Sequence, residues 1–139
     1  MGLYLCVLDA AGEEAEGVEV GSYADFNAFR DALRASALWS GAEAACCPVL
    51  TNHSDCDGMW TSEEAERLLS ELSLADRVMR EQPAIELTQA WKLEVAKTMG
   101  IRPATLLDCF FDVDGEPLVE RLMQLANASV GTGRPILFQ

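Results

Sequence analysis

Basic residues are scarce in this sequence. Ten Lys and Arg stand against twenty-three Asp and Glu, which gives the 139 residues a formal net charge of −13. A field of this sign repels nucleic acid and anionic membranes, so we expect neither as a partner. It favours a basic protein partner or a divalent cation. A third interpretation is that the charge serves only to keep the protein soluble. The composition leaves these three interpretations open.

Histidine occurs once, as His53, and the five cysteines form no Cys-x-x-Cys pair. A single histidine excludes the Cys₂His₂ type of zinc site. An odd number of cysteines argues against a secreted disulfide framework and predicts a reducing, cytoplasmic location. No nucleophile signature surrounds any cysteine, so cysteine catalysis is disfavoured. Cys6 and Cys109 lie in apolar segments, where we expect inert core residues.

Long apolar runs are absent as well. None approaches the length of a transmembrane helix, and the apolar opening lacks the basic flank and cleavage site of a signal peptide. No Walker, Rossmann or Gly-x-Ser-x-Gly pattern occurs. Paired carboxylates carry little weight in a chain this acidic. We therefore predict a protein without enzymatic activity and without a cofactor.

The remaining composition is that of a folded domain, since half of the residues are hydrophobic. A chain of this length buries a core without disulfides and has the size of one domain. No linker or low-complexity tract interrupts it. We predict a single domain over residues 1–139.

Apolar segments predict up to five short strands. They cover residues 2–8, 18–20, 48–52, 106–113 and 135–138. The first two are expected to form a hairpin, with residues 9–17 as the loop between them. The third follows a small-residue loop, and the fourth ends in an Asp-Gly turn.

Helical spacing of apolar residues predicts three to four helices between these strands. The first is capped by Ser22, with Asp25 as a capping-box variant, and the second starts at Thr61 and stops before Pro83. The third covers 88–99, with Trp91 and Val95 facing inward, and ends at Gly100, and the last has Pro117 as its first residue. Strands and helices do not alternate strictly, which favours α+β over a doubly wound fold. The predicted fold is a mostly antiparallel sheet of four to five strands packed with these helices.

The sharpest local motif is the stretch 53–64, which reads HSDCDGMWTSEE. With Gly58 as the glycine of an EF-hand loop, Asp55, Asp57 and Glu64 fall on ligand positions. However, a histidine replaces the first aspartate, and the preceding segment is predicted as strand. An Asp-Gly turn followed by a helix capping box explains the same residues, and we favour this interpretation. A divalent-metal-binding regulatory or structural module is the alternative function.

The pattern Asp-x-Asp-Gly recurs at residues 112–115, again between a predicted strand and a predicted helix. If both loops lie at one edge of the sheet, their aspartates form a cluster suited to a basic partner or a shared cation. Trp60, beside the first loop, either packs as a hydrophobic staple at the N-terminus of the following helix or is an anchor residue in the interface with a partner. The candidate partner-binding residues are Asp55, Asp57, Trp60, Asp112, Asp114 and Glu116.

Five strings spread along the whole chain carry a family resemblance. They read MGLYLC, GSYADF, HSDCDG, DVDGEPL and RPILFQ, at residues 1–6, 21–26, 53–58, 112–118 and 134–139. Through them the chain resembles the predicted immunity proteins of bacterial polymorphic toxin systems. The resemblance implies a small cytoplasmic α+β protein, encoded beside a toxin gene, that binds the toxin and blocks it. It transfers no binding residues. A nuclease toxin with a basic active site would suit a partner of charge −13, which is a hypothesis from charge alone.

Overall fold

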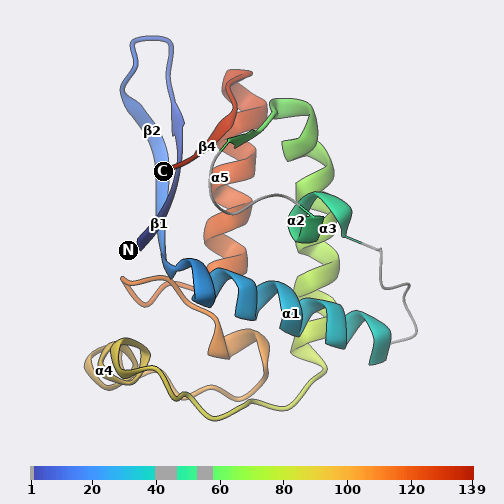
Figure 1. Ribbon diagram of the computed structural model, residues 1–139, viewed down its shortest axis with the longest axis vertical. Helices are drawn as coiled ribbons and strands as arrows, with labels where there is room; N and C mark the ends of the chain where they lie inside the picture. The colour runs from blue at the N-terminus through green and yellow to red at the C-terminus, as the bar shows by residue number, and fades with distance from the viewer. Residues whose placement is uncertain (1, 40–46, 53–57) are drawn as a thin grey trace.

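The structure is a computed structural model that describes residues 2–39, 47–52 and 58–139. A sheet stands on one side of the molecule, and three long helices pack against its inner face and against one another (Figure 1). The strands are β1 Gly2–Leu8, β2 Glu14–Ser22, β3 Met59–Trp60 and β4 Ile136–Phe138. The helices are α1 Tyr23–Trp39, α2 Pro48–Asn52, α3 Ser62–Arg80, α4 Ala90–Met99 and α5 Leu118–Thr132, with a 3₁₀ turn, η1, at Leu107–Cys109.

The four strands pair in the order β2-β1-β4-β3, and every pairing is antiparallel. This confirms the predicted α+β class, although the described residues form five helices where three to four were expected. The β1–β2 hairpin is confirmed, but β2 starts earlier than predicted. Asp9 closes the turn by accepting hydrogen bonds from the backbone N–H groups of Ala11 and Glu13, so Glu14 already pairs with Leu8.

The core forms where the inner face of the sheet meets α1, α3 and α5. The helical stripes predicted from spacing are the buried faces of these helices, including Phe26, Phe29 and Leu33 on α1. The first turn of α1 is capped as predicted, because Ser22 Oγ accepts from the Asp25 N–H and the Asp25 carboxylate accepts from the Ser22 N–H. Spacing and caps thus locate the large helices correctly.

Residues 48–52 are a helical turn, α2, so the predicted strand is wrong. The cause is a distant carboxylate. Glu71 on α3 accepts hydrogen bonds from the backbone N–H groups of Val49 and Leu50 at 3.2 and 2.9 Å. A carboxylate satisfies the donors that the start of a helix leaves unpaired. Nothing near residue 48 in the sequence signals this contact.

The strand predicted over 106–113 is also wrong. Asp108 accepts hydrogen bonds from the N–H groups of Ala104 and Thr105, both at 3.1 Å, which folds the chain into the 3₁₀ turn η1. Of the following residues, Phe111 forms only an isolated bridge with Pro117. The apolar run is buried as a turn, because Cys109, Phe110 and Phe111 pack into the interior.

Candidate partner-binding surface

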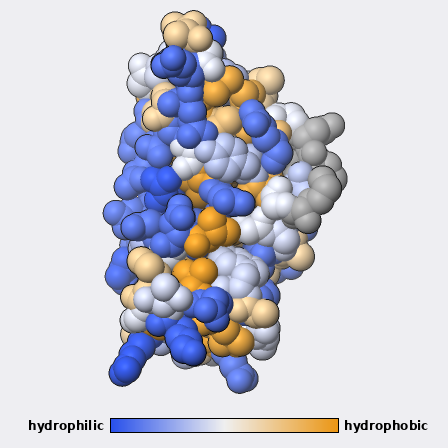
Figure 2. All heavy atoms as spheres, turned by 90° about the vertical axis from the view of Figure 1, so that its left-hand side faces the viewer, coloured by the Kyte–Doolittle hydropathy of each residue, from blue (hydrophilic) through white to orange (hydrophobic). Residues whose placement is uncertain are grey.

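Two adjoining hollows of about 480 and 270 Å³ lie between α4, β2 and the turn 112–116, and both are lined by Val95 and Val113. We name this surface the acid-rimmed groove and define it by Glu19, Trp91, Glu94, Val95, Val113 and Asp114. Figure 2 looks onto this side of the molecule, where a strip of apolar surface runs between hydrophilic side chains. The residues that line the two hollows include the apolar side chains of Trp91, Val95 and Val113 and the carboxylates of Glu19, Glu94 and Asp114.

Gly21 allows α4 to approach the sheet. It lies in β2 next to an irregularity in the β1–β2 register, with φ +119°. A Cβ atom at this position would lie 2.9 Å from the Trp91 ring and 2.8 Å from the Asp25 carboxylate. Any other residue would therefore be strained and would push Trp91 away.

Asp25 ties α4 to the start of α1. Its side chain is only 5% exposed. Besides the Ser22 N–H, its carboxylate accepts hydrogen bonds from Gln89 Nε2 at 3.2 Å and from Trp91 Nε1 at 3.1 Å. One buried carboxylate thus fixes the entry of α1 and the first turn of α4 together.

Lys92 holds α4 from a second direction and is 4% exposed. Its Nζ donates to the backbone carbonyl of Cys109 at 3.1 Å. The ring centroids of Phe110, Phe111 and Trp91 lie 4.7, 5.5 and 5.7 Å from Nζ, within the range of cation–π attraction. Burial lowers the pKa of Lys92, and the charge of Asp25 opposes this effect. Periodicity had placed Trp91 and Val95 inward, whereas both are only half-buried and Lys92 is the buried residue.

The turn 112–116 forms the other wall of the groove. Asp112 Oδ1 accepts from the N–H groups of Asp114 and Glu116 at 2.9 and 3.0 Å. Its Oδ2 accepts from Arg121 Nε at 3.3 Å. The Val113 N–H donates to the Glu19 carbonyl at 3.2 Å, which fixes the turn to β2. The second Asp-x-Asp-Gly motif is therefore a turn held by its first aspartate.

The predicted partner-binding residues fall into three groups. Asp114 and Glu116 are exposed, and Asp114 lines the groove. Asp112 is 1% exposed and Trp60 0% exposed, so neither side chain offers a surface to a partner. The Trp60 indole donates to the Val49 carbonyl at 3.0 Å and packs edge-on against Phe138. The remaining two, Asp55 and Asp57, lie outside the described residues.

The metal-site alternative rests on the same two aspartates and on Glu64. The Glu64 carboxylate accepts from the Thr61 N–H at 3.1 Å, and Thr61 Oγ1 accepts from the Glu64 N–H at 3.1 Å, so the predicted capping box is confirmed. Within residues 2–39, 47–52 and 58–139, no three His, Cys, Asp or Glu side chains group as metal ligands would. Asp55 and Asp57 are not covered by this search.

The hypothesis of a shared acidic cluster required the two Asp-x-Asp-Gly loops to lie at one edge of the sheet. Gly58, the end of the first loop, accepts a hydrogen bond from the Phe138 N–H, on the side of the sheet where β3 is the edge strand. The turn 112–116 contacts β2, which is the opposite edge strand. The described part of the first loop is therefore separated from the second by the width of the sheet.

Sequence reasoning missed Glu19 and Glu94. Glu19 lay in a strand for which the hairpin partner 2–8 was the predicted neighbour and no helix was placed beside it, and Glu94 lay on a helix whose packing partner was unknown. One signal was available: Trp91, Leu93, Val95 and Met99 put apolar side chains on several sides of the helix 90–99. Such a pattern is typical of a helix with more than one contact face.

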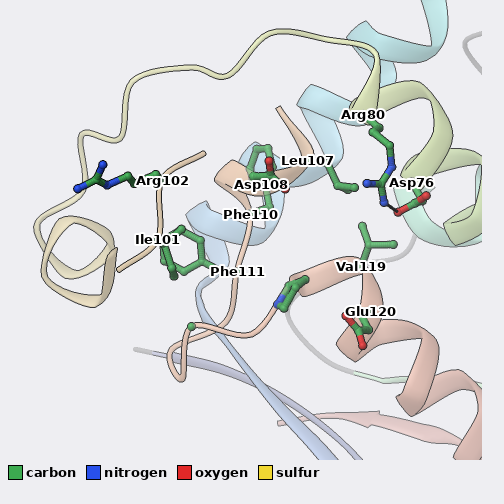
Figure 3. A pocket seen from close by; sticks show the side chains of 12 residues that line it. Asp76, Arg80, Ile101, Arg102, Leu107, Asp108, Phe110, Phe111, Val119 and Glu120 are labelled. Atoms are coloured by element: carbon green, nitrogen blue, oxygen red, sulfur yellow. Dashed lines mark hydrogen bonds and ion pairs between the residues drawn. The ribbon is translucent and has the colours of Figure 1, made fainter. Parts of the chain in front are cut away.

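A further hollow of about 460 Å³ lies between α3, residues 101–111 and the start of α5 (Figure 3). Its floor is apolar, with Phe110, Phe111 and Val119. Its rim carries both signs, since Asp76 pairs with Arg80 at 2.8 Å and further residues of each charge lie nearby. Mixed charge selects no particular ligand, so the acid-rimmed groove is the better candidate for a partner.

None of the helices in the described part of the chain combines the length and the apolar composition that a membrane span requires.

Comparison with known proteins identifies the family. No curated protein and no solved structure matches the chain. The profile of the family described as Immunity protein 70 matches residues 3–138. This confirms the resemblance to immunity proteins that the five sequence strings indicated. Because the match covers almost every residue, the chain belongs to the Immunity protein 70 family.

Proposed function

We propose that this protein is a cytoplasmic immunity protein of a polymorphic toxin system, and that it neutralises its cognate toxin by binding and occluding it. The observation that carries the proposal is the family match over residues 3–138. Binding rather than chemistry is the expected mode of action, because an inhibitor needs a complementary surface and no reacting group.

The charge of the protein supports a basic toxin. Among the described residues, two basic side chains (Arg30 and Lys92) and three acidic ones (Asp25, Glu71 and Asp112) are buried, so the surface keeps nearly the whole negative charge of the sequence. An acidic protein attracts a basic one over several ångströms and orients it before contact. A nuclease binds phosphates through a basic surface, and we propose a nuclease as the toxin class that suits this charge.

A cytoplasmic site of action agrees with the cysteines. Cys6 and Cys109 are buried thiols. Burial raises the pKa of Cys6, which keeps this thiol protonated and unreactive at neutral pH. Such thiols suit a reducing compartment.

Co-expression tests the proposal. The toxin encoded beside this gene is expressed in bacterial cells with and without this protein, and a charge-matched unrelated acidic protein serves as the control. We expect growth only with this protein, and a complex of the two purified chains that survives gel filtration at submicromolar concentration. No rescue, together with no complex at micromolar concentration, would contradict the proposal.

A further inference from the structure

We infer that the acid-rimmed groove is the docking site for the toxin, and that its occupant is a cationic toxin segment that also carries an apolar side chain. The inference deepens the proposed function and rests on it. It concerns which surface binds and what chemistry the bound segment has.

The lining of the groove selects this occupant. Trp91, Val95 and Val113 are half-buried along the floor and leave apolar surface open to solvent, and Met99 beside them is 55% exposed. The carboxylates of Glu19, Glu94 and Asp114 are exposed beside this floor. Among the described residues that line the two hollows, none is Lys or Arg. An apolar floor beside carboxylates complements an apolar side chain flanked by Lys or Arg.

The groove is held in place before a partner arrives. The contacts of Asp25 and Lys92 fix α4 on two sides, and the Val113 N–H fixes the turn 112–116 to β2. Gly21 leaves the space that the Trp91 ring needs. A preformed surface loses little conformational freedom on binding, which favours tight association.

Other occupants fit less well. A second copy of this chain would bring a protein of charge −13 to a rim that is already acidic. A single metal ion would need converging ligands, and no group of three potential ligands exists among the described residues. The two hollows together have room for several side chains, which suits a peptide segment.

The test compares two variants with the same change in net charge. Glu94→Lys with Asp114→Lys reverses two exposed groove charges, and Glu66→Lys with Glu81→Lys reverses two exposed charges on and just after α3. The affinity of each for the purified toxin encoded by the adjacent gene is measured by isothermal titration. We expect the groove variant to bind at least about 10-fold more weakly than the control variant. Equal weakening would overturn the inference.

A neutral variant separates shape from charge. Met99→Ala removes an exposed apolar side chain at the groove without altering the net charge, and the exposure of Met99 makes a folding defect unexpected. We expect weaker toxin binding and an unchanged unfolding midpoint. Unchanged binding in both the Met99 variant and the groove charge variant would overturn the inference even if the wild type binds tightly.

The outcomes of these experiments distinguish a failure of the proposed function from a failure of the groove as the docking site. A wild-type chain that fails to bind the toxin contradicts the proposed function. A wild-type chain that binds, while the groove and control variants lose the same affinity, contradicts only the groove. If gel filtration instead finds a wild-type dimer that the groove variant abolishes, the groove belongs to a second copy and the inference is wrong.

Discussion

At the scale of single residues, carboxylates have two different roles in this protein. Asp25, Glu71 and Asp112 are buried and accept hydrogen bonds from the backbone or from side chains of other elements. Glu94 and Asp114 are exposed at the groove. All five contribute equally to the composition, so the charge of −13 alone does not separate structural from surface acids.

Replacing the two aspartates of the second Asp-x-Asp-Gly motif separates these roles. Asp112→Ala removes the acceptor of two backbone N–H groups and one of the acceptors of Arg121, so we expect a loss of about 2–4 kcal/mol in the free energy of unfolding. Asp114→Ala removes an exposed side chain and should change the free energy of unfolding by less than about 0.5 kcal/mol. Urea unfolding measures both. Equal effects would contradict the structural role of Asp112.

The pH dependence of stability tests the buried carboxyl of Glu71. Burial raises its pKa above the ordinary 4.5, against the opposing hydrogen bonds from Leu50 and Val49 and the charge of Arg67. The folded state therefore holds this proton to higher pH than the unfolded state. The stabilisation of the folded state by the protonated Glu71 carboxyl is complete below pH 4.5 and is lost as the pH rises through the raised pKa.

Glu71→Gln removes this titration. We expect the difference in unfolding free energy, wild type minus variant, to be largest below pH 4.5 and to decrease as the pH rises above that value. Denaturant titrations from pH 4 to pH 8 follow the difference. A difference that stays constant or grows with pH would show that the carboxyl does not titrate as proposed.

At the scale of elements, α4 stands apart from α3 and α5 and is fixed by a few side chains (Figure 1). Its position depends on the hydrogen bond between Trp91 Nε1 and the Asp25 carboxylate, 3.1 Å long. An element held by few contacts opens more readily than the core. The position of one wall of the groove therefore depends on the contact between Trp91 and Asp25.

A double-mutant cycle measures this anchor. Trp91→Phe removes the indole donor, and Asp25→Ala removes its acceptor together with the cap of α1. We expect a coupling free energy of about 1 kcal/mol and faster amide exchange in α4 for either variant. Coupling near zero, with unchanged exchange in α4, would mean that other contacts position the helix.

Local signals in the sequence predicted the elements that local chemistry determines. The Ser22–Asp25 and Thr61–Glu64 caps and the left-handed Gly100 after α4 all lie where the sequence indicated. Of the two wrong strands, 48–52 depends on a contact with the distant Glu71, which no local pattern indicates. The other, 106–113, is turned by Asp108, which follows Thr105 at the spacing of a helix cap, a signal that its apolar residues outweighed in the prediction. Of the groove carboxylates, only Asp114 was predicted as a partner-binding residue. Glu19 and Glu94 come together because α4 packs beside β2, and the sequence does not predict that placement.

At the scale of the whole molecule, the excess of carboxylates should govern how fast a partner is captured. Ionic strength screens charges beyond a Debye length of about 10 Å at 0.1 M salt. If the toxin is basic, we expect its association rate constant to fall by about 10-fold or more between 50 mM and 500 mM NaCl. The dissociation rate should change less. Stopped-flow mixing measures both, and an association rate independent of salt would contradict electrostatic steering.

Hydrogen exchange of this protein, alone and in complex with the toxin encoded beside it, tests directly whether the acid-rimmed groove binds the toxin. If it does, the toxin slows exchange in α4, in the turn 112–116 and in β2 near Glu19, which border the groove. Protection confined to other surfaces, such as the hollow between α3 and α5, would contradict the groove as the docking site.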